Sequence, residues 1–480
     1  MAQEEQEYDV IVIGGGPPGE NAAARARRGG LSAVLVEHEL VGGECSYWAC
    51  MPSKALLRPV ELLAAARRLP GVAEAVTGEL DARAVFDRRD RFVGKDPDKP
   101  YGHDDGGQAS WLESTGIDLV RGHGLLAGEK RVEVVTPDDG HRTLAARHAV
   151  VLATGTGATV PPLPGLREAR PWTSRQATNA EEAPGRLVVL GGGVVGCETA
   201  QAMRALGSAE VTVVDSAPRL LPKQEPVAAE LLTAAFREAG IDIVTGVSAK
   251  EVRRPRPGGS VTLVLEDGRE FVGDELLVAV GRTPSTADLG LETVGLEPGR
   301  YVEVDDSMHA LGGWLYACGD VTGRNLLTHM GKYQARVAGD VIAARAAGRP
   351  DDGRGMRAVA DHDWVPQVVF TDPQVGSAGL TEEQARDREL PVRVIDYELG
   401  RVAGASLLVD GYSGHARMVV DTERGVVVGA TFVGADIAEL VHSATVAVVG
   451  EVPLDRLWHA VPSYPTISEV WLRLLEAYGL

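Results

Sequence analysis

Short apolar runs that lead into glycine turns and alanine-rich stretches set the pattern of the chain. Residues 8–13, YDVIVI, predict a buried strand, GGGPPGENAAARARRGG predicts a glycine turn that opens a helix, and LSAVLVE predicts a second strand. The same order returns in RLVVLGGGVVGCETAQAMRALG and AEVTVVD. Two distant copies of one strand–turn–helix–strand unit indicate two nucleotide-binding domains.

The segments around these two copies have other patterns. Residues 56–115 are polar and predicted to be helical, and residues 117–160 are predicted to form several short strands. Further strands are predicted over 262–281, and a helix over about 327–346. The stretch 347–361 is rich in Gly, Arg and Asp, which is typical of a linker. The strand-like and helical segments after it predict a third domain of α+β type.

Composition limits the class of protein. A chain of 480 residues with 44% hydrophobic content is too long for one core and suggests about three domains. The net charge of -20 argues against nucleic acid as a partner. The acidic N-terminus has no signal-peptide pattern, and no apolar run is long enough for a membrane span, so we expect a cytoplasmic protein without a membrane partner.

The first glycine turn has the spacing of a dinucleotide-binding motif. Gly14, Gly16 and Gly19 form G-x-G-x-x-G, in which glycine allows a tight turn and a close approach to a pyrophosphate. The following helix offers free N–H groups to the phosphates. Glu37 ends the second predicted strand, where a carboxylate can bind ribose hydroxyls.

The second glycine turn repeats this arrangement. Gly191, Gly193 and Gly196 form the motif, and Asp215 ends the next predicted strand. A carboxylate there favours a free 2′-hydroxyl over a 2′-phosphate, which predicts NADH. Arg219 lies nearby and could offset the repulsion, so NADPH stays possible.

Two cysteines stand five residues apart in GGECSYWACMPSK. A regular helix would separate the Cα atoms of Cys45 and Cys50 by roughly 7.5 Å along its axis, and a disulfide needs less than about 7 Å. A bridge between them therefore requires a distorted first turn, and strained bridges are easily reduced. The alternative is a pair of buried free cysteines. Tyr47 and Trp48 either narrow access to the pair or only pack the helix.

These motifs occur together with ATG at 153–155, AVGRTP at 279–284 and CGD at 318–320. The set resembles the class I pyridine nucleotide–disulfide oxidoreductases, the family of dihydrolipoamide dehydrogenase, glutathione reductase and mercuric reductase. The resemblance covers nearly the whole chain in the right order. It implies a flavoprotein enzyme that uses FAD and a nicotinamide.

The resemblance also implies an architecture. The fold is expected to be α/β, with two Rossmann-like nucleotide-binding domains and a C-terminal α+β dimerisation domain. Residues 1–160 and 285–350 would form the FAD-binding domain, 161–284 the NAD(P)-binding domain, and 362–480 the dimerisation domain. Such enzymes are homodimers in which the last domain completes the partner's active site.

Roles follow from the resemblance by position. Cys45 would be the thiol that attacks a substrate, Cys50 the thiol against the flavin, and Lys54 would pair with Glu198 near the flavin. Further cofactor-binding positions, beyond the two glycine motifs and their acids, are Gly43, Lys54, Thr154, Gly155, Gly281, Gly319 and Asp320.

The C-terminal segment departs from the disulfide-reducing members. They read His-Pro-Thr, whereas this chain has Tyr464-Pro465-Thr466, with Glu469 retained five residues after the tyrosine. A histidine has a reference pKa near 6.5 and a tyrosine near 10, so a phenol cannot become the cation that stabilises a thiolate. We therefore expect poor turnover of lipoamide or glutathione disulfide.

The predicted activity is electron transfer from NADH through FAD to the Cys45–Cys50 disulfide, and on to a disulfide or other thiol-reactive small molecule. One alternative is a quinone or dye reductase, or a transhydrogenase, that acts directly from the flavin, because soluble transhydrogenase and mercuric reductase share a tyrosine near position 464. Another is a non-catalytic flavoprotein. No metal-ligand spacing is present.

Overall fold

The computed structural model describes residues 5–353 and 355–480. Tertiary contacts divide the chain into two compact units, each made from three separate segments. The first unit comprises Met1–Pro52, Asp90–Ala158 and Arg282–Asp361; the second comprises Ser53–Arg89, Thr159–Gly281 and His362–Leu480. This division does not test the domain bounds given above, which stay a prediction.

The first unit is built on a mixed sheet whose central strands are apolar on both faces. The strands follow the order β16 (His309–Leu311), β17 (Leu315–Ala317), β6 (His141–Leu152), β1 (Gln6–Ile13), β2 (Ala33–Glu37) and β3 (Ile117–Arg121). β1 pairs in parallel with β2 and β6, and Val10, Ile11 and Val12 are fully buried. β4 (His123–Leu126) and β5 (Arg131–Val135) extend this sheet from β6 in antiparallel pairs.

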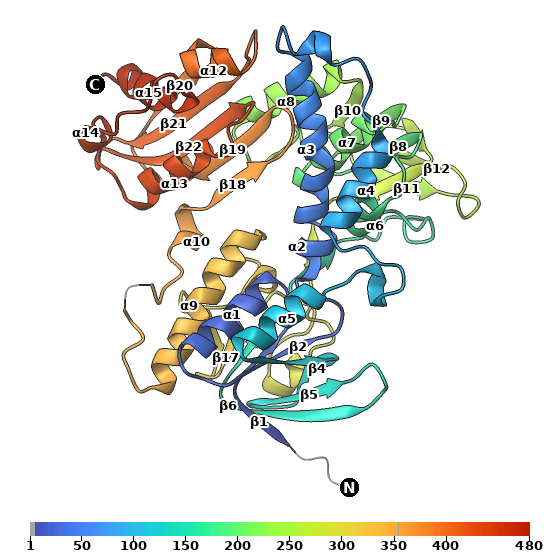
Figure 1. The fold of residues 1–480 in the computed structure, drawn as a ribbon, viewed down its shortest axis with the longest axis vertical. Coiled ribbons are helices and arrows are strands. Elements are labelled where there is room, and N and C mark those ends of the chain that lie inside the picture. Colours follow the sequence, from blue (N-terminus) through green and yellow to red (C-terminus); the bar gives the residue numbers. More distant parts are fainter. Residues whose placement is uncertain (1–4, 354) are drawn as a thin grey trace. The chain divides into compact units, whose positions relative to one another are not determined.

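Two long helices cover this sheet side by side. Figure 1 shows α1 (Pro17–Arg28) along α9 (Thr328–Ala346), and small residues let the two helices approach closely. A side chain at Gly339 would overlap Arg25, and one at Gly29 would overlap Ala343. The other elements of this unit are α2 (Gly43–Tyr47), η2 (Pro100–Gly102), α5 (Gly106–Thr115), β7 (Thr156–Ala158), β15 (Arg282–Pro284), η3 (Leu291–Val294) and η4 (Asp320–Thr322).

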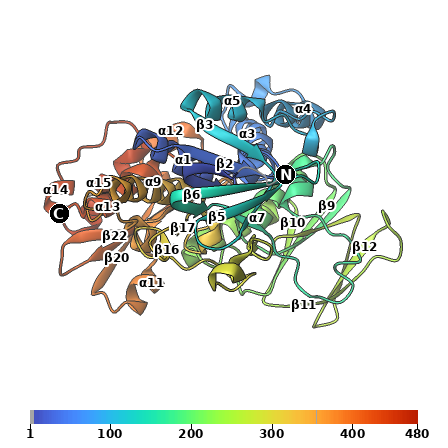
Figure 2. The same ribbon diagram turned by 90° about the horizontal axis from the view of Figure 1, so that it is seen from below.

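The second unit contains a four-stranded parallel sheet of the same type. Its order is β10 (Ile241–Thr245), β9 (Glu210–Asp215), β8 (Arg186–Leu190) and β14 (Glu275–Val278). β11 (Ala249–Arg253), β12 (Val261–Leu265) and β13 (Glu270–Gly273) form a separate antiparallel sheet, whose β11 and β12 are labelled in Figure 2. The helices of this part are α6 (Ser174–Asn179), α7 (Val194–Ala205) and α8 (Pro226–Glu238), with η1 (Ala73–Ala75) before them in the chain.

The C-terminal part of the second unit is an antiparallel sheet with helices. Its order is β18 (Pro366–Val369), β19 (Gln374–Gly379), β22 (Val426–Gly434), β21 (His415–Asp421) and β20 (Val392–Glu398). Every residue of β22 is buried, as a central strand requires. The helices are α11 (Glu382–Asp387), η5 (Leu399–Arg401), α12 (Ala403–Leu408), α13 (Leu440–Val449), α14 (Leu454–Leu457), η6 (Ile467–Glu469) and α15 (Val470–Tyr478).

Three of the five unit boundaries fall within helices, namely α3 (Cys50–Arg67), α4 (Ala82–Phe92) and α10 (Ala360–Asp363). The predicted linker over 347–361 is therefore wrong at its end, because Ala360 begins a helix and Asp361 is buried. None of the helices in residues 5–353 and 355–480 is long and apolar enough to cross a membrane.

Candidate active site

The inner side of the first glycine turn leaves no room for side chains. Gly14 has φ +102°, and a Cβ on it would overlap the carbonyl oxygen of Ala153. A Cβ on Gly19 would overlap the carbonyl oxygen of Gly14, whereas a Cβ on Gly16, the N-cap of α1, would only make ordinary contacts with Pro18 and Gly43. The turn is therefore too tight for side chains on its inner side and leads directly into the N-terminus of α1, which is the geometry a pyrophosphate needs.

The carboxylate of Glu37 holds this turn in place. Its Oε2 accepts a hydrogen bond from the Gly15 N–H at 2.6 Å, and its Oε1 accepts one from the Glu39 N–H at 2.7 Å. Burial acts against the charge, but hydrogen bonds from His38 and from these N–H groups lower the pKa of Glu37. A carboxylate oxygen can accept more than one hydrogen bond, so capacity for ribose hydroxyls remains.

The hydroxyl of Thr154 finds no hydrogen-bond partner in the described part of the chain. Its Oγ1 is buried and has no hydrogen-bond partner there. Close by in the sequence, Thr156 donates to Asp320 at 2.9 Å and accepts a hydrogen bond from Arg282 Nε at 2.6 Å. Burial raises the pKa of Asp320. A buried hydroxyl without a partner beside the glycine turn fits a site for a bound nucleotide cofactor such as FAD.

The two cysteines lie on different helices. Cys45 belongs to the five-residue helix α2, Trp48 leaves helical geometry with φ -134°, and Cys50 begins α3. The predicted distortion is thus an interruption of the helix between the two residues. The structure holds both as thiols, without a disulfide bond between them. Tyr47 and Trp48 are buried and pack with Leu40.

Thr328, the first residue of α9, contacts both thiols. Its Oγ1 donates to Cys45 Sγ at 3.1 Å and lies 3.4 Å from Cys50 Sγ. The hydrogen bond with Cys50 and burial raise the pKa of Cys45, whereas Thr328 and the charge of Lys332 act to lower it. The sequence pattern did not single out Thr328, whose one signal was its position at the start of a predicted helix.

The second glycine turn repeats the geometry of the first in the second unit. A Cβ on Gly191, which has φ +115°, would overlap the carbonyl oxygen of Ala279, and one on Gly196 would overlap that of Gly191. Gly193 has open space around it. Gly281 has φ +145°, and a Cβ on it would have only Thr159 within 4 Å among the described residues.

Asp215 and Arg219 both form hydrogen bonds with backbone groups. Asp215 accepts hydrogen bonds from the Gly192 N–H at 2.5 Å and the Ala217 N–H at 2.7 Å. Arg219 Nη2 donates to the carbonyl oxygens of Pro222 and Gln224, each at 3.1 Å. The guanidinium is thus bound to local carbonyls.

Lys54 and Glu198 form an ion pair in the second unit. Lys54 Nζ lies 2.6 Å from Glu198 Oε2, and Glu198 is buried in α7. Glu198 Oε1 accepts the Phe370 N–H at 2.9 Å, and the ammonium lies 5.0 Å from the centroid of the Phe370 ring. These contacts fix the direction of the lysine.

Tyr464 and Glu469 lie in different environments. Tyr464 is 76% exposed. Glu469 is buried and accepts a hydrogen bond from Arg473 at 2.5 Å, and its Oε2 has no partner among the described residues. No group of three or more His, Cys, Asp or Glu side chains in the described ranges could hold a metal ion.

Comparisons with known proteins identify the family. The family model described as pyridine nucleotide-disulphide oxidoreductase matches residues 8–345, and the dimerisation domain of the same family matches residues 365–474. The chain belongs to this family. Membership confirms the predicted fold class, a flavoprotein oxidoreductase and the cofactors FAD and NAD(H). The matched dimerisation domain supports the predicted homodimer.

Individual relatives of the family match nearly the whole chain. Dihydrolipoyl dehydrogenase of Thermus scotoductus is 34% identical over 477 residues, which are 98% of this chain and 97% of that protein. Mercuric reductase of Staphylococcus aureus is 30% identical over 469 residues, 96% of this chain and 81% of that protein. The crystal structure of LpdA from Mycobacterium tuberculosis superposes with a TM-score of 0.83 at 26% identity and covers 99% of this chain and 100% of that one.

Proposed function

We propose that this oxidoreductase uses NADH to reduce the Cys45–Cys50 disulfide and passes the electrons to a disulfide or other thiol-reactive small molecule. The observation that carries the proposal is the convergence of both thiols on one hydroxyl, since Thr328 Oγ1 lies 3.1 Å from Cys45 Sγ and 3.4 Å from Cys50 Sγ. FAD, when bound, supplies two-electron transfer between the nicotinamide and this disulfide.

The chain offers a complete set of groups for FAD. The turn of Gly14, Gly16 and Gly19 would receive the pyrophosphate at the N-terminus of α1, and Glu37 the ribose. The unsatisfied hydroxyl of Thr154 supports this assignment. The remaining positions that we assign to FAD are Gly43, Lys54, Gly155, Gly319 and Asp320.

NADH is the nicotinamide that we assign to the second turn. Gly191, Gly193 and Gly196 would receive its pyrophosphate, with Gly281 beside it, and Asp215 would accept a hydrogen bond from the free 2′-hydroxyl. A 2′-phosphate would meet the Asp215 carboxylate. Arg219, which could offset that repulsion, already donates to two backbone carbonyls.

The thiol chemistry balances without a further reagent. One NADH and one proton convert the disulfide to two thiols and release NAD⁺. The Cys45 thiolate then attacks a sulfur of the acceptor disulfide and displaces one thiolate. Cys50 attacks Cys45, which restores the Cys45–Cys50 bond and releases the second thiolate, while protons lost by the two cysteines go to the two leaving thiolates.

Thr328 and the ion pair would support this cycle. The hydroxyl of Thr328 donates to Cys45 and so stabilises its thiolate against the burial that raises its pKa. The Lys54–Glu198 pair, fixed by Phe370, would keep a cation oriented one helical turn after Cys50.

The acceptor is proposed to differ from the usual disulfides. In the homodimer, Tyr464 and Glu469 of one subunit would complete the active site of the other. The exposure of Tyr464 suits such a role, and its phenol cannot form the cation that a histidine provides at neutral pH. We expect slow reduction of lipoamide and glutathione disulfide, and Tyr464→His should accelerate both.

The test is an anaerobic titration of the purified holoenzyme with NADH, followed by counting of alkylated thiols. We expect two new thiols per FAD in the wild type, and a long-wavelength thiolate-to-flavin absorbance band. Cys50→Ser should abolish the new thiols and the band, whereas Cys197→Ser, which changes a fully buried thiol elsewhere, should leave both unchanged. Flavin reduction without new thiols in the wild type would contradict the proposal and point to direct reduction of quinones or dyes.

A further inference from the structure

The Gly319–Asp320 turn depends on a buried amide. The Gly319 N–H donates to Gln334 Oε1 at 2.7 Å, and Gln334, in the second turn of α9, is fully buried. Gly319 has φ +81°, and a Cβ on it would lie 2.7 Å from Pro18 Cγ. The position of this turn is therefore fixed on one side by α1 and on the other by one side-chain oxygen.

The direction of that amide is set by Asp361. Gln334 Nε2 donates to Asp361 Oδ2 at 3.0 Å, and the Asp361 side chain is 1% exposed. A carboxylate can only accept, so it selects the amide orientation that turns Oε1 toward Gly319. Without this acceptor, the amide could present its NH2 group to the Gly319 N–H, and one hydrogen bond would be lost.

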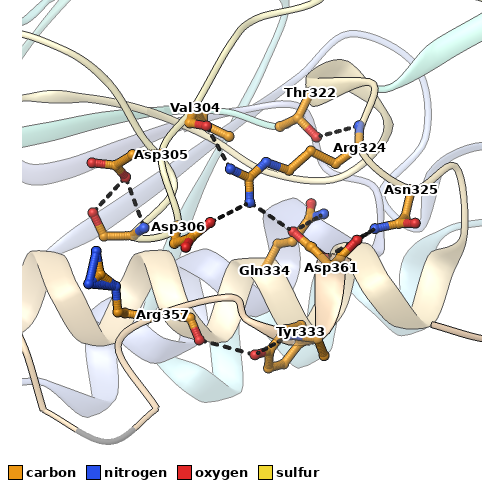
Figure 3. Close-up of polar contacts among 12 residues, drawn as sticks. Val304, Asp305, Asp306, Thr322, Arg324, Asn325, Tyr333, Gln334, Arg357 and Asp361 are labelled. Atoms are coloured by element: carbon orange, nitrogen blue, oxygen red, sulfur yellow. Dashed lines mark hydrogen bonds and ion pairs between the residues drawn. The ribbon is translucent and has the colours of Figure 1, made fainter. Parts of the chain in front are cut away.

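Asp361 is in turn held by two donors, as Figure 3 shows. Arg324 Nη1 lies 3.3 Å from Asp361 Oδ2 and 3.3 Å from Asp306 Oδ1, and Nη2 donates to the Val304 carbonyl at 2.7 Å. Asn325 Nδ2 lies 3.3 Å from Asp361 Oδ1 and donates to the backbone carbonyl of Asp361 at 3.0 Å. The carboxylate is thus fixed by groups that precede α9 in the chain, although its own segment has the composition of a linker.

We propose that Gln334 and Asp361 are positioning residues for the FAD site, because they orient the hydrogen bond that holds the Gly319–Asp320 turn. The inference rests on the proposed binding of FAD at Asp320. Neither side chain needs to touch the cofactor. Their effect is on the backbone that carries Asp320, so they control how tightly FAD is retained.

The test measures the dissociation constant of FAD from the fluorescence released on dilution of the holoenzyme. Gln334→Glu keeps the acceptor for Gly319 but replaces the donor with a second carboxylate beside Asp361, and FAD should bind at least about tenfold more weakly. Asp361→Asn alone should have a small effect, because the side-chain oxygen of the introduced amide can still accept from Gln334.

The decisive variant combines both changes. In Gln334→Glu/Asp361→Asn the direction of the hydrogen bond is reversed, since the amide introduced at position 361 can donate to a carboxylate that still accepts from Gly319. FAD affinity should recover at least about threefold from that of Gln334→Glu, but stay below the wild type because the amide nitrogen then faces the Arg324 guanidinium, which also donates to Asp361 Oδ2. Asp306→Asn, which alters the other carboxylate on Arg324 without touching Gln334, is the matched control and should change affinity by less than about twofold.

Two outcomes separate this inference from the proposed function. A double variant that binds FAD as weakly as Gln334→Glu, while wild type binds FAD tightly, overturns the orienting role. Failure of the wild type itself to bind FAD would overturn the proposed function instead. Urea unfolding of each FAD-free variant shows whether a loss reflects the turn or the stability of the whole unit, and a loss of affinity that follows stability alone also overturns the inference.

Discussion

Gly14 and Gly191 open turns of the same local geometry, since a Cβ on either would overlap a carbonyl oxygen. Gly19 and Gly196 likewise each face the carbonyl of the first glycine of their own motif. The acids repeat as well, because Glu37 and Asp215 both accept two backbone N–H groups next to their turns. The two copies diverge only beyond the turn.

In the first unit the start of the helix is enclosed. Pro18 in α1 would be within 2.8 Å of a Cβ on Gly319 or Gly331, so two further elements close around it. In the second unit Val195, in the first turn of α7, is 39% exposed. An enclosed turn suits a cofactor that stays bound, and an open one suits a nicotinamide that leaves in each catalytic cycle.

The two motifs differ in the residues that follow their third glycine. Glu20 and Asn21 follow Gly19, whereas Cys197 and Glu198 follow Gly196. Cys197 is fully buried and its thiol donates to the Gly192 carbonyl at 3.3 Å, so it only packs the turn. Glu198 forms the ion pair with Lys54. The second copy thus contributes a charged pair that the first copy lacks.

We expect the largest difference between the two turns when the third glycine of each motif is replaced by alanine. Gly19→Ala forces a Cβ into the Gly14 carbonyl, and we expect the protein to be isolated without FAD. Gly196→Ala should keep FAD but lower kcat/KM for NADH at least about 100-fold, because the nicotinamide turn is distorted. Absorbance of the purified proteins and steady-state kinetics check both results. Equal FAD loss in the two variants would contradict the assignment of the turns.

Asp215 should affect the choice between NADH and NADPH, whereas Glu37 should affect the binding of FAD. Asp215→Asn removes the repulsion toward a 2′-phosphate, so the preference for NADH over NADPH should fall by about tenfold. Glu37→Gln should weaken FAD retention and leave the nicotinamide preference as it is. The ratio of kcat/KM values for the two nicotinamides measures this, and an unchanged ratio in Asp215→Asn would mean that other residues select the nucleotide.

The hydroxyl of Thr328, at the start of α9, contacts the two thiols of the first unit. Thr328→Val removes the group that lowers the pKa of Cys45, so alkylation of the NADH-reduced enzyme should slow about threefold to tenfold at pH 8. Thr328→Ser retains the hydroxyl and should react like wild type. Equal rates in all three proteins would show that the hydrogen bond does not stabilise the thiolate.

The smallest effect concerns the carboxyl that follows the first motif. Burial raises the pKa of Glu20 to about 7, with Lys332 acting to lower it. The folded protein therefore holds a proton that the unfolded chain releases, and stability falls as pH rises toward and through 7. Relative to wild type, Glu20→Gln should gain a few degrees in Tm between pH 5 and pH 8.5. Lys332→Met should instead lose Tm relative to wild type as the pH rises. If the Tm of wild type and of both variants changed with pH in parallel, the raised pKa of Glu20 would be contradicted.

The parts that the sequence predicted well are those with local constraints. The two glycine motifs fix their turns, strands and acids within about 25 residues, so both copies were placed from the pattern alone. Thr328 and Cys45 lie 283 positions apart, and nothing local marks their contact. Asp361 sits in a stretch whose composition is that of a linker, and only the buried Gln334 beside it gives the aspartate a role. Tyr464 was visible as a departure from a motif, but the role that we propose for it involves a second subunit.

The order of segments in the first unit has a consequence for how the protein is made. This unit needs residues from three stretches, and the last one, Arg282–Asp361, follows the whole second glycine motif and its sheet. The nucleotide-binding half of the second unit is therefore synthesised before α9, which packs along α1, exists. The first unit therefore stays incomplete while Thr159–Gly281 is synthesised, and the proposed FAD site is complete only once Arg282–Asp361 has been made.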